Sequence, residues 1–296
     1  MRFSSIGALA LAMGMSGLVH ADENLFGYIK GAETLPKGAF EVYQFATQRS
    51  DKGVGSYTAW DFKTEAEYGF TNRLTSTLGI KTMSLDTSGI WINGYLPGDR
   101  QFGLKAAGLE GQLKYNFLSP AKDDIGLSMT TELNYDWLDA HSGRDKKKIE
   151  FELGLQLQKL FAEGQVSWVS NLALETTYAR RQPIDNLPED FEWPTHPEME
   201  IGLKAGTGVM ARFANKWSIG AEALYQAEYE TEVGLERWSL FAGPTLHYGD
   251  KKWWATLTYF PQVRGGGEMY DDQTLTQLHL IEKTRREVRF KIGFNF

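Results

Sequence analysis

The sequence contains no cysteine, and this absence excludes several classes of protein. Without thiols there can be no disulfide framework, no thiolate metal site and no lipid-modified N-terminal cysteine. Beyond the first twenty residues, no apolar run approaches the ~20 residues that a membrane-spanning helix needs. Lys and Arg are in the minority, with 31 against 38 Asp and Glu, and the formal net charge of −7 argues against nucleic acid as a partner.

The N-terminal residues have the pattern of a secretory signal peptide. A single early cation, Arg2, precedes an uncharged apolar stretch over residues 6–19, and a small-residue cleavage site ends at Ala21. The alternative is a retained membrane anchor, which is disfavoured because the stretch is shorter than the ~20 apolar residues of a spanning helix. We therefore expect residues 1–21 to be a cleaved signal peptide.

Most of the remaining chain alternates apolar and polar residues with a period of two. In the stretch WDFKTEAEYGF, residues 60–70, one face is mostly aromatic while the other carries Lys63, Glu65 and Glu67. Such repetition predicts an all-β protein, a single transmembrane antiparallel up-and-down β-barrel of about 12 strands, with roughly 10 to 14 left open. A soluble β-sandwich is the alternative, disfavoured because charges fill the opposite face so consistently.

The expected connections between strands alternate in length. Short turns are predicted at 71–73, 119–124, 161–165, 214–216 and 249–252, and long polar loops at 86–101, 138–147, 181–197 and 261–280. Outer-membrane barrels have this layout, with short periplasmic turns and longer extracellular loops. Aromatic residues gather beside both sets of strand ends, as they do in interfacial girdles. We therefore assign residues 39–296 to an outer-membrane β-barrel.

Residues 22–38 fit no strand and form a separate N-terminal segment. They are expected either to remain in the periplasm or to dock inside the barrel lumen. Their apolar residues, Leu25, Phe26, Tyr28 and Ile29, favour docking, because a solvated apolar cluster is unfavourable.

The end of the chain, EVRFKIGFNF, is an alternating strand that closes on an aromatic residue. It resembles the signal that the bacterial barrel-assembly machinery reads, and Phe290, Ile292, Phe294 and Phe296 carry the resemblance. An even number of strands returns the chain to its starting side, so both termini are expected in the periplasm.

Two short motifs resemble those of a known family. The ETLPKG entry to the first strand and the EYGFTNRL turn are similar to those of proteobacterial outer-membrane proteins of uncharacterised function. The resemblance implies a barrel and supplies no substrate.

A barrel of this width cannot be filled by side chains alone, so its lumen must hold water, a plug or a ligand. The candidate lumen-lining residues are Glu65, Glu67, Lys81, Glu110, Lys114, Glu132, Glu150, Glu152, Glu222, Arg289 and Lys291. The excess of carboxylates at inward positions favours cations if the lumen is open. The alternative is that these groups pair across neighbouring strands. The candidate pairs are Glu65 and Glu67 with Lys81, and Glu41 with Lys291.

The pattern as a whole predicts a non-enzymatic passive channel, a porin-like pore for small polar or cationic solutes. A plugged structural or lipid-handling barrel is one alternative, and a lipid-modifying enzyme is another. The enzyme needs a Ser–His pair, but Ser239 and His247 lie eight residues apart on one strand, too far at ~3.3 Å per residue. No cofactor or metal is expected.

The expected location is the bacterial outer membrane. The expected partners are outer-membrane lipids, lipopolysaccharide and the assembly machinery, with no nucleic acid. The oligomeric state is left open.

Overall fold

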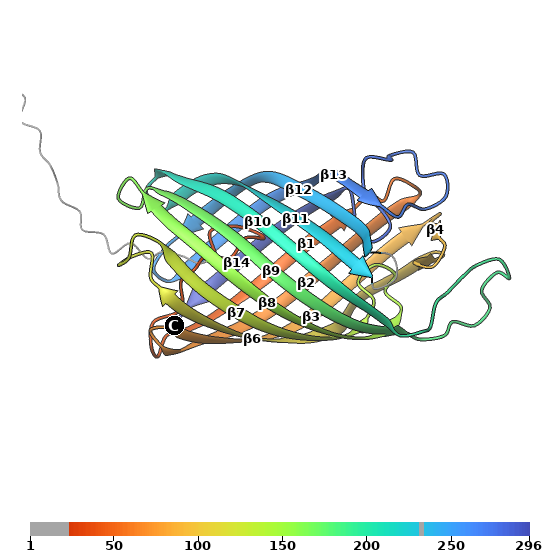
Figure 1. The fold of residues 1–296 in the computed structure, drawn as a ribbon, viewed down its shortest axis with the longest axis horizontal. Helices are drawn as coiled ribbons and strands as arrows, with labels where there is room; N and C mark the ends of the chain where they lie inside the picture. Colours follow the sequence, from red (N-terminus) through yellow and green to blue (C-terminus); the bar gives the residue numbers. More distant parts are fainter. Residues whose placement is uncertain (1–23, 231–233) are drawn as a thin grey trace, which may run out of the picture.

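The computed structural model describes residues 24–230 and 234–296, so the expected signal peptide lies outside the described residues. The described chain forms a closed antiparallel β-barrel of 12 strands (Figure 1). The barrel strands are β1 (Phe40–Ser50), β2 (Ser56–Thr71), β3 (Leu74–Ser88), β6 (Arg100–Leu118), β7 (Gly126–Leu138), β8 (Asp145–Phe161), β9 (Val166–Arg181), β10 (Glu198–Ala214), β11 (Trp217–Glu230), β12 (Gly234–Gly249), β13 (Trp253–Gly267) and β14 (Arg286–Asn295). Two short strands, β4 (Trp91–Ile92) and β5 (Leu96–Pro97), pair with each other outside the barrel.

The first and last strands close the sheet. Val42 of β1 lies opposite Phe294 of β14, and Ser50 lies opposite Arg286. Closure removes both sheet edges, which matters in hydrocarbon because an unpaired backbone group there costs several kcal/mol. The predicted fold class, an up-and-down transmembrane barrel of about 12 strands, is confirmed.

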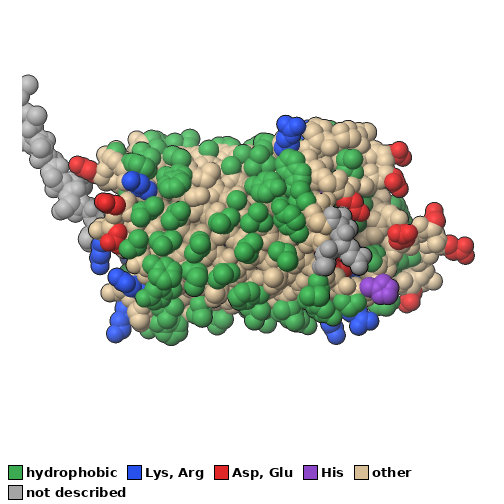
Figure 2. All heavy atoms as spheres, in the orientation of Figure 1, with side chains coloured by type: hydrophobic (Ala, Val, Ile, Leu, Met, Phe, Trp, Pro, Cys, Tyr) green, Lys and Arg blue, Asp and Glu red, His purple; other side chains and the backbone are tan. Residues whose placement is uncertain are grey.

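The outer and inner faces of the barrel have opposite character. Outward side chains such as Leu78 and Ile80 are 70% and 55% exposed, whereas the inward Glu65 and Thr77 are 3% and 2% exposed. Figure 2 shows the outward apolar side chains as a broad band across the visible face of the barrel, with charged side chains gathered near its two ends. Because a soluble protein would hide this much contiguous apolar surface, the band is suited to contact with lipid.

Short turns and long loops lie at opposite ends of the barrel. We call the end with turns 72–73, 119–125, 162–165, 215–216 and 250–252 the turn rim. The loop rim carries loops 51–55, 89–99, 139–144, 182–197 and 268–285. Exposed aromatic side chains flank both rims, among them Phe70, Phe213 and Trp217 near the turn rim and Trp60, Tyr178 and Tyr259 toward the loop rim.

The predicted loop boundaries are wrong at the loop rim, where strands run further than the alternation indicated. β3 continues to Ser88 and β13 to Gly267, so the loops expected at 86–101 and 261–280 occupy 89–99 and 268–285. The glycines at 265–267, which lie inside the predicted loop 261–280, pair with β12 instead. A Cβ on Gly267 would lie 2.1 Å from the carbonyl oxygen of Glu236, so the two strands approach too closely there for a side chain.

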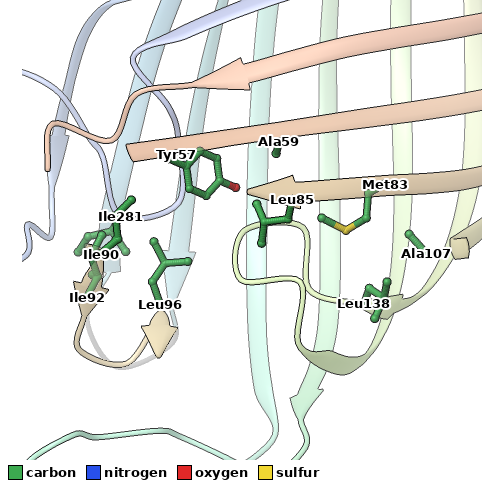
Figure 3. Close-up of a cluster of buried hydrophobic side chains, with 10 residues drawn as sticks. All are labelled: Tyr57, Ala59, Met83, Leu85, Ile90, Ile92, Leu96, Ala107, Leu138 and Ile281. Atoms are coloured by element: carbon green, nitrogen blue, oxygen red, sulfur yellow. The ribbon is translucent and has the colours of Figure 1, made fainter. Parts of the chain in front are cut away.

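An apolar cluster inside the loop rim holds two loops over the barrel (Figure 3). Tyr57, Met83 and Leu85 come from β2 and β3, and they gather with Ile90 of loop 89–99 and Ile281 of loop 268–285. The cluster is an inward apolar patch in a barrel whose other inward side chains are largely polar. The alternation is inverted at this end, because the inward Tyr57, Met83 and Leu85 are apolar while their outward neighbours Thr58, Ser84 and Asp86 are polar.

Lys52, in the loop 51–55, holds loop 268–285 from within. The residue is fully buried, and its Nζ donates to the carbonyl oxygens of Leu280, Ile281 and Lys283 at 3.2, 2.7 and 3.1 Å. Burial lowers the pKa of Lys52 to about 7.

The stability of this loop closure is therefore expected to depend on pH. Above pH 7 the folded chain releases the Lys52 proton that the unfolded chain keeps up to its ordinary pKa near 10.5. The free energy of unfolding should rise by at most ~1.4 kcal/mol per pH unit across this window and stay flat below it. Urea unfolding in lipid vesicles should show the wild type gaining on the Lys52→Met variant between pH 7 and pH 10. A constant difference between the two would mean that Lys52 stays charged.

Candidate functional site

The N-terminal residues 24–37, which we call the plug segment, cross the lumen near the turn rim. Their path begins at Asn24, whose side-chain oxygen accepts from Lys291 Nζ at 2.7 Å. It ends beside the turn between β2 and β3, where the backbone N–H of Lys37 donates to Asn72 Oδ1 at 2.9 Å. Side chains of eight strands make hydrogen bonds with the plug segment, namely those of β3, β6, β7, β8, β9, β11, β13 and β14. The segment is therefore held from most sides of the barrel.

Glu222 of β11 is the main anchor of the plug segment. Its carboxylate accepts the consecutive backbone N–H groups of Gly27, Tyr28 and Ile29 at 2.7, 2.8 and 3.1 Å. Thr245 and Thr258 each donate a hydroxyl to the same carboxylate at 2.8 Å. Hydrogen bonds to an ionised acceptor are roughly twice as strong as neutral ones. Glu222 thus gives three backbone donors of the plug segment a partner that water would otherwise supply.

Further polar contacts hold the middle of the segment. Lys30 Nζ donates to Gln112 Oε1 at 2.6 Å and lies 3.0 Å from Glu132 Oε2. The Asn171 side chain bonds both the N–H and the carbonyl of Lys30, at 2.7 and 2.8 Å. Lys114 Nζ donates to the Gly31 carbonyl at 2.7 Å. Backbone N–H and carbonyl groups of the segment therefore find their hydrogen-bond partners on the barrel wall.

Two glycines on β10 make room for the apolar side chains of the plug segment. A Cβ on Gly208 would lie 2.6 Å from the Phe26 ring, and one on Gly206 would lie 2.3 Å from Ile29 Cδ1. Phe26 and Ile29 are fully or almost fully buried and pack against Val169 of β9. The segment therefore fits a space shaped for it rather than lying loosely in water.

Between the plug segment and the loop rim, the lumen wall is a ladder of ion pairs. Lys63 lies 2.7 Å from Glu65 and 3.0 Å from Glu110. Lys204 pairs with Glu152 at 2.7 Å and also with Glu175. The carboxylates that sequence alone suggested as an acidic wall are thus largely neutralised by neighbouring cations.

The expected pairing of Lys81 with Glu65 and Glu67 is wrong. Lys81 instead lies 3.1 Å from Asp136 of β7. The register explains the difference, because Lys81 faces Lys63 on β2 and the residue between Lys81 and Asp136 is Gly108. With no side chain at Gly108, the lysine reaches across β6 and away from the like charge.

Two cavities of about 370 and 380 Å³ lie in the lumen and share lining residues such as Lys63 and Lys204. Tyr28, Ile29 and Lys30 of the plug segment bound one of them, and His141 and Lys283 of the loops line both. Burial lowers the pKa of His141 well below its usual range. Acidic and basic side chains are nearly balanced around both cavities, so the interior is polar without a strong charge of one sign.

A second charged group surrounds Arg237 of β12 at the loop rim. The guanidinium, whose side chain is 3% exposed, lies 2.7 Å from Glu200, 2.8 Å from Glu236 and 3.2 Å from Glu282, and it also pairs with Glu228. Glu282 belongs to loop 268–285, so Arg237 ties this loop to the barrel wall.

The structure places the sequence-derived lumen residues in three groups. Five of them touch the plug segment directly, namely Lys114, Glu132, Glu222, Arg289 and Lys291. Five belong to ion pairs of the wall, namely Glu65, Lys81, Glu110, Glu150 and Glu152. Glu67 accepts from the Tyr43 hydroxyl at 3.1 Å.

The terminal strand presents its apolar residues on the opposite, outer face. Phe290, Phe294 and Phe296 are exposed and Ile292 is half-buried. At the closing seam the backbone N–H of Phe296 donates to the Phe40 carbonyl at 2.9 Å.

Sequence reasoning overlooked the inward aromatic residues of β12 and β13. Phe241, Trp254 and Phe260 are buried on the lumen side, and Phe260 stacks on Tyr28 of the plug segment. The available signal was the stretch WWATLTYF, in which both faces of the strand begin and end with aromatic residues. His247, the candidate catalytic base, contacts Thr256 Oγ1 at 2.8 Å and stacks on Trp254.

Across residues 24–230 and 234–296, no group of three or more His, Asp or Glu side chains is arranged to hold a metal ion. The same residues contain no helix long and apolar enough to cross a membrane.

Solved outer-membrane barrels share this fold. An outer membrane channel from Pseudomonas putida F1 superposes with a TM-score of 0.56 at 14% identity, over 90% of this chain and 98% of the channel. The β-domain of the Bordetella autotransporter BrkA gives a TM-score of 0.54 at 10% identity, over 88% of this chain and all of that domain. At such low identities the likeness shows the fold alone. No curated protein sequence matches this chain.

Residues 18–296 match the model of a protein family whose function is unknown. The match covers nearly the whole chain, and it agrees with the resemblance that the ETLPKG and EYGFTNRL motifs carry. The protein is a member of that family, DUF6662, whose fold here is an outer-membrane β-barrel.

Proposed function

We propose that the protein is an outer-membrane channel for small polar solutes and that the plug segment closes it in the state described here. The observation that carries the proposal is the lumen itself. It is polar and contains cavities of about 370 and 380 Å³, and the plug segment, which belongs to no strand, crosses it. If the barrel's own side chains filled the interior, no space would remain for such a segment. The similar fold of an outer membrane channel from Pseudomonas putida F1 is consistent with this function.

The proposed orientation places the turn rim and both chain ends in the periplasm, as short turns and long loops do in other outer-membrane barrels. Outer-membrane lipids and lipopolysaccharide would surround the apolar band, and the assembly machinery would read the terminal strand. Protease added to intact cells should cleave only loop-rim segments such as 182–197 if this orientation holds. Cleavage at turn-rim segments in intact cells would reverse the orientation.

Single-channel recording of the mature chain in planar bilayers tests the channel. We expect rare, small openings with at most a weak cation preference, because most wall carboxylates are paired with lysines. A variant that lacks residues 24–37 should open more often and conduct more, since the deletion leaves the barrel strands intact. Absence of conductance in both proteins, with both folded in the bilayer, would rule out a channel.

The alternative is a permanently plugged structural or lipid-handling barrel. The hydrogen bonds of the plug segment with eight strands favour this alternative. The same recording separates the two functions, because a structural plug leaves the full chain silent while its deletion alone conducts.

A further inference from the structure

One side chain of the plug segment occupies a built site on the lumen wall. The ring of Tyr28 stacks on Phe260 of β13 with ring centroids 4.2 Å apart and an angle of 17° between the planes. The Arg289 guanidinium of β14 lies 3.8 Å from the centre of the same ring. Two groups at these distances cannot share one face of a ring, so Tyr28 lies between them.

The polar end of Tyr28 is also matched by the wall. Its hydroxyl donates to Glu287 Oε2 at 2.6 Å, and Glu287 faces Phe260 directly in the register of β13 and β14. Arg289 is itself held in place, because its Nε donates to Thr47 Oγ1 at 2.8 Å and its Nη1 to the Gly27 carbonyl at 3.1 Å. The stacking ring, the cation and the acceptor all belong to the wall or are positioned by it.

Space for a solute adjoins this site. The cavity of about 380 Å³ is lined by Tyr28, Phe241, Phe260, Glu287 and Arg289. Phe241 stacks on Phe260 with centroids 5.6 Å apart, so aromatic surface continues from Tyr28 along the wall. A molecule in this cavity would meet the wall groups as soon as the Tyr28 ring moved away.

The chemistry of the site selects one kind of ligand. An aromatic ring gains from stacking on Phe260 and from the cation above its face, whereas a saturated sugar ring lacks the π system that attracts a guanidinium. The Glu287 carboxylate accepts a hydrogen bond from a hydroxyl at the ring edge and repels an anion. A phenol satisfies all three requirements, as the Tyr28 side chain itself demonstrates.

We propose that Phe260, Glu287 and Arg289 form a binding site for the phenolic ring of a solute, and that Tyr28 occupies this site in the closed state. The proposal rests on the channel function and deepens it by naming the solute class. A phenolic solute competes with Tyr28 for the wall, and it therefore favours the state in which the plug segment is displaced.

Calorimetric titration of the mature chain in detergent with p-cresol, the free equivalent of the tyrosine side chain, tests the site. Tyr28→Ala should bind p-cresol at least ~10-fold more tightly than the wild type, because the competing ring is gone. Toluene lacks the hydroxyl and cyclohexanol lacks the π face, so both should bind the variant more weakly than p-cresol. Adding Glu287→Gln to Tyr28→Ala should remove much of the preference for p-cresol over toluene.

Matched variants separate the site from a mere hole. Phe26→Ala also empties a buried ring position in the plug segment, but one that faces Gly208 rather than Arg289. The Phe26→Ala variant should show no preference for p-cresol over toluene. If Tyr28→Ala does not fold, Tyr28→Phe keeps the ring, loses the hydroxyl bond to Glu287, and should still bind p-cresol more tightly than the wild type. Equal binding of p-cresol and toluene to the folded Tyr28 variants would overturn the proposal.

Binding and conduction are separate readouts. Selective p-cresol binding in a protein that never conducts would defeat the channel function and leave the phenol site standing. Conductance that p-cresol does not raise, together with no selective binding, would defeat the site and leave the channel standing.

Discussion

Replacing Glu222 by glutamine is expected to release the plug segment and raise the frequency of channel opening by about 100-fold. The variant loses the negative charge to which three consecutive backbone N–H groups donate. The glutamine amide also has an N–H₂ group, which cannot accept from these N–H groups. A loss of about 3 kcal/mol, the scale of one or two hydrogen bonds to a charged group, shifts the docked equilibrium by about 100-fold. The absence of cysteine from the chain offers a second readout that does not depend on conduction.

That readout is thiol labelling of Ala32→Cys. Ala32 is fully buried in the docked plug segment, so its labelling rate reports the undocked population. We expect slow labelling in the wild-type background and labelling about 100-fold faster with Glu222→Gln, in proportion to that population. Glu152→Gln is the matched control, because it removes one lumen carboxylate that pairs with Lys204 instead of the plug segment. Equal labelling with Glu222→Gln and Glu152→Gln would show that Glu222 does not anchor the segment.

Replacing Arg237 by methionine is expected to destabilise the barrel by about 3–5 kcal/mol, the usual effect of leaving buried charges without their partner. Methionine replaces the apolar stem of the arginine but carries no charge, so Glu200, Glu228, Glu236 and Glu282 lose the guanidinium that they surround. Glu282 should then move outward and carry loop 268–285 with it. Urea unfolding in lipid vesicles measures the free energy, and limited proteolysis of the loop measures its release.

Two further variants make the second prediction specific. Lys216→Met breaks an exposed ion pair with Asp250 at the turn rim and should change stability little, because solvent screens such pairs. Adding Glu228→Gln to Arg237→Met should restore part of the loss, since it removes one of the uncompensated charges. If the double variant is no more stable than Arg237→Met alone, the loss does not come from unpaired carboxylates.

The barrel could be predicted from the sequence because its rule is local. In the stretch from Trp60 to Phe70, each residue needs only its neighbours to show which face meets lipid and which meets the interior. The prediction lost accuracy beyond the membrane, where lipid no longer imposes the alternation. There, Met83 and Leu85 point inward to pack under the loops, and β13 extends to Gly267.

The sequence favoured docking of the N-terminal segment in the lumen, but which groups the lumen side chains contact was decided by the tertiary structure alone. An inward carboxylate has the same sequence pattern whether it meets water, a lysine or a backbone, so Glu222 could not be distinguished from Glu152. The backbone N–H groups that donate to Glu222 lie 193 to 195 residues away along the chain. Lys81 reaches Asp136 only because Gly108, which lies between them on β6, has no side chain. The sequence by itself determined a closed barrel with an apolar exterior, since hydrocarbon acts on every outward residue separately. The contacts of the plug segment, the cavities and the ion pairs depend on which strands face one another across the lumen. That arrangement exists only once the barrel has closed.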